Sequence, residues 1–286
     1  MKFAMGRVLK LRKIKLLIDG DILVYRLAFA CQVRNKEVEP LKNVLHLAKK
    51  TIKDMQARWE TENIKIYLTS DDHSNFRFEL AKTKPYKGNR DPKINPKAPA
   101  KPYYYETLRK YFIDKYNTEV IYNIEADDAL GIHQMKHLDD PNLETIICSI
   151  DKDLDMIPGR HYNFVTDTDY HCTDPGTLRL SDDRKKLIGE GLAWFYAQMI
   201  LGDSADNIPG LPKHGPVKVL EILGDCKTED EMWKEVQRTY IEQLGEEFGV
   251  KSTYSRLYEV ADLLWMHRKE GDCKSECLRN MALYYT

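Results

Sequence analysis

Short apolar runs that alternate with helical periodicity constrain the fold of this chain more than any other feature. Four runs have the length and composition of buried strands, at residues 14–18, 64–68, 120–124 and 145–150. Residues 41–59 carry apolar side chains at steps of three and four, which is typical of an amphipathic helix. Strands that alternate with helices predict an α/β fold, in which a mostly parallel sheet is flanked by helices.

Acidic residues follow each predicted strand. They occur as Asp19 and Asp21, Asp71 and Asp72, Glu125, Asp127 and Asp128, and Asp151, Asp153 and Asp155. Because the carboxyl ends of parallel strands meet at one edge of a sheet, we expect these groups to converge. Carboxylates in such proximity repel one another unless a cation neutralises them, and magnesium or manganese suits an all-oxygen site. The sequence therefore predicts a two-cation site of the kind that hydrolyses phosphodiesters.

Each acidic group also has an ordinary structural interpretation. The acids of residues 125–128 could lie at a helix N-terminus, and those of residues 203–206 could cap helices. The run Asp151–Asp155 resembles the start of a calcium loop, but Met156 and Tyr162 occupy the positions where that loop needs glycine and glutamate. The occurrence of acids at successive strand ends favours a shared site over these separate interpretations.

A lysine- and proline-rich segment, residues 82–102, cannot belong to a core. Charged residues make up 31% of the chain while the formal net charge is −1, so a basic surface requires segregation of the two signs. The segment and its borders supply Lys82, Lys84, Lys87, Arg90, Lys93, Lys97 and Lys101, with Tyr86, Tyr103, Tyr104 and Tyr105 beside them. Lysines reach phosphates, and aromatic rings stack on unpaired bases. We predict an arch or clamp over about 82–118 for single-stranded DNA; a merely solvated loop is the alternative.

Helical patterns dominate after about residue 190. They cover residues 191–201, 216–223, 229–244 and 254–268. We therefore predict two units, an α/β domain over residues 1–190 and a helical region over residues 191–286; the family resemblance described below implies catalysis in the first and DNA binding in the second.

The remaining composition points to a protein of the cytoplasm. The chain has six cysteines and no Cys-x-x-Cys pair, so we expect free thiols in a reducing compartment. No apolar run approaches the length of a membrane span, and charges interrupt the apolar stretch of residues 1–18, unlike a secretory signal.

Six motifs in order give the chain a resemblance to a known family. They are Leu17-Ile-Asp-Gly-Asp21, Ser70-Asp-Asp-His-Ser-Asn-Phe-Arg77, Pro85-Tyr-Lys-Gly-Asn-Arg90, Glu125-Ala-Asp-Asp128, Ser149-Ile-Asp-Lys-Asp153 and Gly202-Asp-Ser-Ala-Asp-Asn-Ile-Pro-Gly210. Over most of residues 14–224 the chain resembles the 5′-nucleases: flap endonucleases, phage 5′–3′ exonucleases and the 5′-nuclease domain of bacterial DNA polymerase I. The last motif is the most specific and opens the family's helix–three-turn–helix, here about 198–224.

The resemblance implies a fold and a set of site residues. The fold is a PIN-like sheet with a helical arch and a C-terminal helix–three-turn–helix region. The family's metal-site acids match Asp19, Asp72, Glu125, Asp127, Asp128, Asp151, Asp153, Asp203 and Asp206. Its catalytic basic residues match Lys87, Arg90 and Arg26. Expected DNA contacts are Lys84, Tyr86, Lys93 and Lys97 in the loop, and Lys213, Gly215 and Lys218 in the helix–three-turn–helix.

The resemblance also implies an activity. It is that of a structure-dependent 5′–3′ exonuclease or flap endonuclease, a monomer that cuts DNA with 5′ ends or 5′ flaps using two Mg²⁺ ions, which Mn²⁺ can replace. RNA/DNA hybrids stay open as further substrates. A phage origin, with action in the host cytoplasm, would fit a stand-alone enzyme of this size.

Two departures from the family pattern leave alternatives. Asp71 and Asp72 compete for the second metal-site position, and we prefer Asp72. Lys213-His214-Gly215 replaces the usual Gly-Ile-Gly, so a K⁺ ion in this turn stays open. Two other functions are weighed: a haloacid-dehalogenase-type phosphatase built on Asp19-Gly-Asp21, and a non-catalytic DNA-binding protein on the same fold. The first leaves the lysine-rich segment and the motif at residues 202–210 unexplained.

Overall fold

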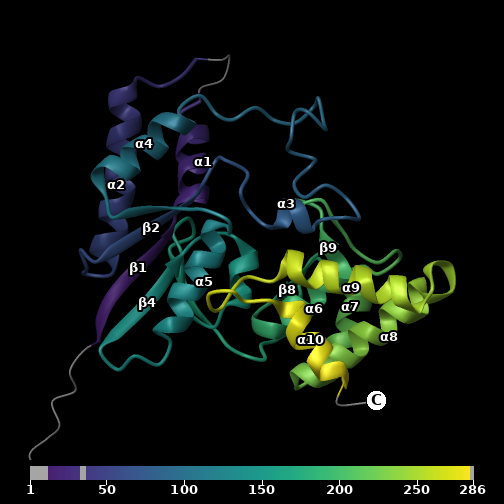
Figure 1. Ribbon diagram of the computed structural model, residues 1–286. Coiled ribbons are helices and arrows are strands. Elements are labelled where there is room, and N and C mark those ends of the chain that lie inside the picture. Colours follow the sequence, from purple (N-terminus) through teal and green to yellow (C-terminus); the bar gives the residue numbers. More distant parts are fainter. Residues whose placement is uncertain (1–11, 33–36, 284–286) are drawn as a thin grey trace, which may run out of the picture.

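A six-stranded sheet forms the core of one part of the molecule, and the C-terminal helices lie beside that part (Figure 1). The computed structural model describes residues 12–32 and 37–283. The ends of the two expected units, residues 1–11 and 284–286, lie outside the described residues, and so does most of the 1–18 stretch that was weighed as a secretory signal. The strand order is β3-β2-β1-β4-β5-β6, with bounds Thr118–Ile121, Ile64–Thr69, Lys13–Asp19, Leu143–Cys148, Gly159–Asn163 and Thr168–Cys172. All neighbours are parallel except β5 and β6, which confirms the mostly parallel α/β sheet.

Strand β1 lies at the switch point of the sheet: β2 and β3 are added on one side of it, and β4, β5 and β6 on the other. It pairs with β2 on one side and with β4 on the other, so Leu16 lies opposite both Ile64 and Ile146. Ligands of open parallel sheets bind outside the carboxyl ends of the strands at such a point. This topology brings the end of β1, at Asp19, beside the end of β4.

The two faces of the sheet have separate helical covers. Side chains alternate along a strand, so Leu16 and Ile18 pack on one face and Leu17 packs on the other. Helices α1 (Gly20–Ala30), α2 (Leu41–Arg58) and α4 (Tyr105–Lys115) cover the first face, and α5 (Ala126–Lys136) contacts the second. The predicted amphipathic helix over residues 41–59 is confirmed as α2.

Helices dominate after residue 190, as predicted. They are α6 (Gly191–Leu201), α7 (Pro216–Leu223), α8 (Glu229–Phe248), α9 (Val250–Leu264) and α10 (Lys274–Leu283). Helix α6 is buried over residues 191–200 and packs against α7, α8 and α9. One hydrophobic cluster continues from Leu17 of the sheet to Leu278 of α10, so the two expected units share a core. Among the described helices, none is long and apolar enough to span a membrane.

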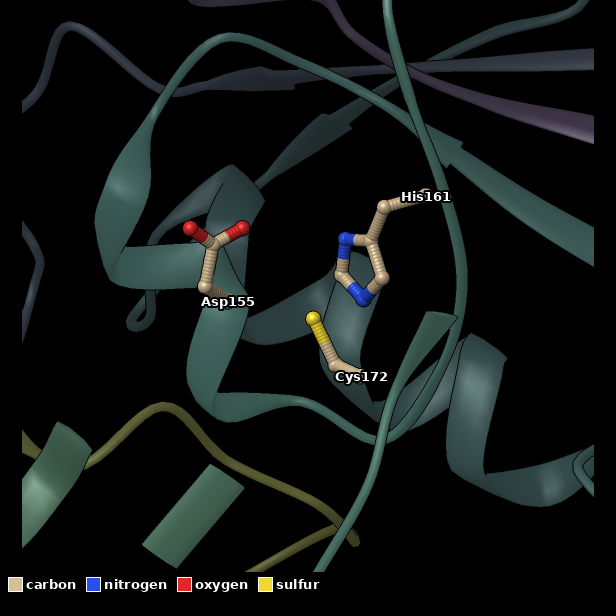
Figure 2. Close-up of side chains that lie close together, drawn as sticks. All are labelled: Asp155, His161 and Cys172. Carbon is tan, nitrogen blue, oxygen red and sulfur yellow. The ribbon is translucent and has the colours of Figure 1, made fainter. Parts of the chain in front are cut away.

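Several short elements were not predicted. The 3₁₀ helix η1 (Lys152–Met156) leads into the hairpin β5–β6, and together they bring Asp155, His161 and Cys172 close to one another (Figure 2). The strands β7 (Leu178–Leu180) and β8 (Leu187–Gly189) form a second pair, and β9 (Gly202–Asp203) and β10 (Ile208–Pro209) form a third. Runs of two to five residues are too short for periodicity to identify them.

The expected helical arch differs from the structure. After α3 (Arg77–Leu80), residues 81–104 form no regular helix or strand, and prolines at 85, 92, 96, 99 and 102 explain why no helix forms. The helix that follows, α4, buries Leu108 and Phe112 completely against the sheet layer. The arch is therefore an irregular segment, and α4 belongs to the core rather than to a clamp.

Candidate active site

Asp19 lies at the centre of the carboxyl edge of the sheet. It ends β1 and caps α1: one carboxylate oxygen accepts a hydrogen bond from the Ile22 amide at 3.0 Å. The other accepts one from the Ser149 hydroxyl at 2.6 Å, which ties the ends of β1 and β4 together. The side chain is fully buried, and this burial raises the pKa of Asp19 to about 7 despite the two hydrogen bonds.

Asp127 and Asp151 surround Asp19 with further negative charge. Burial, followed by the carboxylates of Asp19 and Asp151, raises the pKa of Asp127 well above its usual range. Burial and the neighbouring Asp153 raise the pKa of Asp151 to about 6. Carboxylates that repel one another in this way must hold protons or share a cation.

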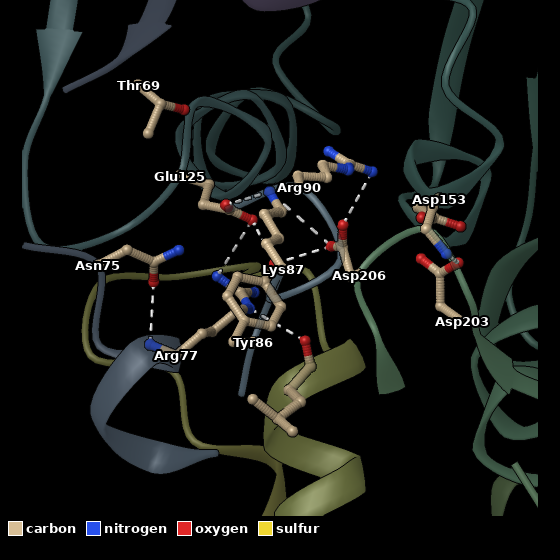
Figure 3. Close-up of polar contacts among 12 residues, drawn as sticks. Thr69, Asn75, Arg77, Tyr86, Lys87, Arg90, Glu125, Asp153, Asp203 and Asp206 are labelled. Carbon is tan, nitrogen blue, oxygen red and sulfur yellow. Dashed lines mark hydrogen bonds and ion pairs between the residues drawn. The ribbon is translucent and has the colours of Figure 1, made fainter. Parts of the chain in front are cut away.

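Asp153 and Asp203 extend the same acidic surface towards the helical region (Figure 3). Asp153 accepts hydrogen bonds from the Gln198 amide of α6 at 2.5 Å and from the Lys152 ammonium at 2.8 Å. Burial and the carboxylate of Asp153 raise the pKa of Asp203. We call Asp19, Asp127, Asp151, Asp153 and Asp203 the acidic cluster. Within the described part of the chain, no lysine, arginine or histidine lies within ion-pair distance of any of these except Asp153.

Glu125 and Asp206 lie beside the acidic cluster and are already neutralised. The Lys87 ammonium lies 2.5 Å from Glu125 and 3.8 Å from Asp206, and Arg90 lies 3.1 Å from Asp206 (Figure 3). Burial opposes the charge on Lys87, but the two carboxylates outweigh it and raise the pKa of this ammonium. The Lys87 amide also donates to the Asp206 carbonyl at 2.9 Å, so the lysine-rich segment is anchored at the acidic site.

Tyr86 does not have the expected exposure of a DNA-stacking ring. It is only 4% exposed, and its hydroxyl lies 2.8 Å from both Glu125 and Asp206. Its ring packs against Phe78. The expectation of direct base stacking by Tyr86 is therefore wrong, because the ring fills the core and its hydroxyl orients two carboxylates.

Asp128 does not face the acidic cluster. The fully buried Arg77 donates to its two carboxylate oxygens at 2.6 and 2.9 Å, and the His267 amide donates at 3.1 Å. Burial opposes ionisation of Asp128, but Arg77 prevails and lowers its pKa. Arg77 also donates to the carbonyls of Leu263 and Trp265. The structure thus replaces the expected metal-ligand role of Asp128 with a buried ion pair that joins α5 to the end of α9.

Asp72 does not reach the cluster either. It is exposed in a turn, where its carboxylate accepts a hydrogen bond from the Ser74 amide at 2.9 Å. Asp71 pairs instead with Lys101 and Arg109. Asp21 was expected among the converging acids but was not assigned as a metal ligand: it accepts a hydrogen bond from the Thr69 amide at 3.1 Å and pairs with Arg109 at 3.2 Å, and burial raises its pKa. The motif Asp19-Gly-Asp21 carried the signal, because both acids follow one strand.

The remaining expected basic contacts lie at the surface. Arg26 is exposed on α1, and no interaction within the described residues links it to the acidic cluster. The other exposed positions are Lys84, Lys93 and Lys97 of the lysine-rich segment, and Lys213, Gly215 and Lys218 at the start of α7. All of these are accessible to a polyanion, and the amides of a helix N-terminus such as that of α7 suit a phosphate.

A family model matches more than half of the chain. The model describes the 5′-3′ exonuclease N-terminal resolvase-like domain and matches residues 15–177, from β1 to the loop after β6. The chain belongs to the 5′-3′ exonuclease family. This membership confirms the resemblance predicted from the motifs and decides against the phosphatase interpretation.

Relatives with similar sequences are bacterial. The chain is 24% identical to DNA polymerase I of Bacillus subtilis over 262 residues, which cover 88% of the chain and 28% of the polymerase. It is 26% identical to a 5′-3′ exonuclease of Buchnera aphidicola over 208 residues, which cover 73% of the chain and 69% of that protein. The chain thus spans about a quarter of the length of the polymerases it matches.

Solved structures share the fold. The flap endonuclease of bacteriophage T5, in a pseudo-enzyme–product complex with DNA and metal ions, superposes with a TM-score of 0.61 and 17% identity, covering 95% of this chain and 98% of that one. A structure of the same phage protein crystallised with metal ions gives a TM-score of 0.56 and 19% identity, covering 94% of this chain and 100% of that one. At these identities the likeness establishes the fold.

Proposed function

We propose that this chain is a metal-dependent 5′–3′ exonuclease and flap endonuclease that hydrolyses DNA phosphodiesters. The observation that carries the proposal is the acidic cluster at the carboxyl edge of the sheet, most of it without a counter-charge, beside an anchored lysine-rich segment. Family membership supports it. We further propose that the chain acts as a monomer in the cytoplasm, with RNA/DNA hybrids as a second substrate class.

The acidic cluster fits divalent cations. Its donors are carboxylate oxygens, which Mg²⁺ prefers and Mn²⁺ accepts. Burial, with a further contribution from neighbouring carboxylates, raises the pKa values of Asp19 and Asp151, and a cation would stabilise their ionised forms. Asp19, Asp127, Asp151, Asp153 and Asp203 would hold the ions, with Asp21 at the border. When bound, two such ions would activate a water molecule and stabilise the negative charge that develops on the phosphodiester.

Residues around the cluster fix its geometry. The Ser149 hydroxyl orients Asp19, and the Gln198 amide orients Asp153 from the buried helix α6. Tyr86 holds Glu125 and Asp206 together through its hydroxyl. Carboxylates positioned in this way lose little entropy when a substrate arrives, which is the general requirement of a preorganised site.

Lys87 and Arg90 supply positive charge for the scissile phosphate. Both now neutralise carboxylates, Glu125 and Asp206, at the border of the acidic cluster. A phosphate that enters beside Lys87 and Arg90 would compete with the two carboxylates for these side chains. Negative charge that grows on the phosphate in the transition state would strengthen the contact.

DNA would contact two surfaces. The exposed Lys213, Gly215 and Lys218 would hold duplex phosphates without reading bases, and the exposed Lys84, Lys93 and Lys97 would receive the 5′ single strand. Cleavage would then fall near the junction between duplex and 5′ strand.

The decisive experiment maps products on 5′-flap and 3′-flap substrates of identical sequence, each end-labelled, with Mg²⁺ or with EDTA. We expect Mg²⁺-dependent cutting of the 5′ flap near the junction. Asp153→Asn should lower the rate by at least about 10²-fold while DNA affinity holds or rises, because one repulsive charge is lost. Preferential cutting of the 3′ flap would overturn the polarity. Binding without cleavage at any Mg²⁺ concentration would identify a non-catalytic DNA-binding protein.

A further inference from the structure

A second group of potential metal ligands lies outside the acidic cluster. It consists of Asp155, His161 and Cys172, whose donor atoms all lie within 4.8 Å of one another (Figure 2). His161 is 2% and Cys172 1% exposed, and Asp155 is half-buried. This group offers nitrogen and sulfur as well as oxygen, so its chemistry differs from that of the acidic cluster.

The register of the β5–β6 hairpin creates the group. Gly159 pairs with Cys172 and His161 pairs with Tyr170, so His161 and Cys172 are diagonal neighbours on one face of the hairpin. His171, between Tyr170 and Cys172, points to the opposite face. Asp155 comes from η1, the element that also carries Asp153 of the acidic cluster.

Hydrogen bonds prepare two of the three side chains for coordination. His161 Nε2 lies 2.8 Å from the Ile157 carbonyl, to which it can only donate, so the lone pair resides on Nδ1. The Tyr170 hydroxyl donates to one oxygen of Asp155 at 2.6 Å and leaves the other oxygen available. Cys172 is a free thiol. Metal-binding histidines usually donate a hydrogen bond from their other ring nitrogen to a carbonyl, and metal-binding carboxylates usually accept one from a neighbouring group, so the Ile157 carbonyl and the Tyr170 hydroxyl match this pattern.

We propose that Asp155, His161 and Cys172 bind one Zn²⁺ ion, with water as the fourth ligand. Zinc takes His nitrogen, Cys sulfur and carboxylate oxygen in tetrahedral geometry, whereas Mg²⁺ selects oxygen alone. Bond lengths of about 2.0–2.3 Å require donor separations of roughly 3.5 Å, so small side-chain rotations complete the site. Binding releases the thiol proton of Cys172 to solvent. The ion would fasten η1, and with it Asp151 and Asp153, to the hairpin.

Co²⁺ tests the site, because a thiolate bound to Co²⁺ gives a charge-transfer absorption that carboxylates alone do not. Full-length protein, stripped with EDTA and returned to excess Mg²⁺, is titrated with Co²⁺. We expect a band that saturates at one equivalent and that an equivalent of Zn²⁺ removes, because zinc binds such sites more tightly. Cys172→Ser should abolish the band, and Cys277→Ser, at an exposed thiol, should retain it.

A third variant keeps the test independent of folding defects at Cys172. Tyr170→Phe preserves the ring that stacks on His161 but loses the hydrogen bond to Asp155, so Co²⁺ affinity should fall by about 10-fold or more. Circular dichroism checks that each variant is folded. Absence of the band in the unaltered protein, or its persistence in Cys172→Ser, would overturn the proposal; so would unchanged affinity in Tyr170→Phe.

Discussion

Asp127 and Asp128 are adjacent in the chain yet have opposite electrostatic surroundings. Burial and two nearby carboxylates raise the pKa of Asp127, whereas the buried Arg77 lowers that of Asp128. Consecutive residues at the start of α5 point about 100° apart around the helix axis, so one faces the acidic cluster and the other faces Arg77 of α3. The sequence places both acids in one motif and cannot separate a ligand from a structural ion pair.

Substitution of these neighbours should therefore have opposite effects on stability. Asp128→Ala leaves the Arg77 guanidinium buried without its carboxylate and should lower the free energy of unfolding by about 3–5 kcal/mol. Asp127→Asn relieves repulsion and should leave the stability of the metal-free protein unchanged or higher. Urea denaturation in EDTA measures both. Equal destabilisation by the two variants would show that Asp128 has no special structural role.

Lys87 should act on the reaction more than on binding. Its ammonium lies at the border of the acidic cluster, so Lys87→Ala should lower the single-turnover rate by about 10²-fold and change the DNA dissociation constant only slightly. Lys93→Ala, at an exposed position of the same segment, is the matched control and should weaken binding without a comparable loss of rate. If Lys87→Ala loses rate and affinity equally, Lys87 is an ordinary phosphate contact.

At the scale of elements, two glycines of the segment between α6 and α7 have different roles. Gly202 has a φ of 70°, and a Cβ at this position would lie 2.2 Å from the Gly210 amide nitrogen. Gly215 has a φ of −89°, and a Cβ there would meet nothing within 4 Å. The fold requires the first glycine, whereas the second lies on the surface where we propose that duplex phosphates approach.

Alanine at each position should separate folding from DNA binding. Gly202→Ala should lower the free energy of unfolding by about 1–3 kcal/mol through backbone strain alone, and the clash with the Gly210 amide nitrogen should add to this loss. Gly215→Ala should fold with near-normal stability but bind duplex more weakly, since its methyl group obstructs the approach to the α7 amides. Thermal denaturation and fluorescence anisotropy provide the two readouts. Normal duplex binding by Gly215→Ala would show that duplex phosphates do not contact the N-terminus of α7.

The sequence predicted elements where they are long and periodic. Residues 41–59 gave α2 within one residue, because apolar spacing over several turns is unambiguous. Residues 191–201, which are apolar almost throughout, gave α6 through their length. It did not predict β7 and β8, which have three residues each, or the core packing of α4. The site was predicted to the same extent. Acids at strand ends, such as Asp19 and Asp151, converge as expected. The roles of Tyr86, Asp72 and Asp128 were not predicted, because they depend on side-chain directions that a sequence pattern does not encode.

At the scale of the whole molecule, the acidic cluster links metal binding, pH and stability. Burial raises the pKa of Asp19 to about 7, above the unfolded value of about 4. Between pH 4 and pH 7 the folded chain therefore holds a proton that the unfolded chain has released. The contribution of Asp19 to the free energy of unfolding is fully present below pH 4 and is lost as the pH rises through 7. Bound cations should offset this loss, since they replace the proton.

Metal removal should expose this dependence. In EDTA, Asp19→Asn should gain stability relative to the unaltered protein as the pH rises from 5 to 7, by about 2 kcal/mol, because the amide does not titrate. With saturating Mg²⁺ at pH 7 the order should reverse. Urea denaturation across this pH range checks both statements. A difference that does not vary with pH would mean that Asp19 is ionised in the metal-free protein.

The hydrophobic cluster that runs from Leu17 to Leu278 has a consequence for synthesis on the ribosome. The chain emerges from its N-terminus, so the strands around Leu17 are complete long before α9 and α10 exist. Until then, Phe195 of α6 lacks the ring of Trp265 that packs against it, and Arg77 lacks the carbonyls of Leu263 and Trp265. We therefore expect the face of the sheet on which Leu17 lies to stay partly uncovered, and prone to aggregation, until the last helices have been synthesised.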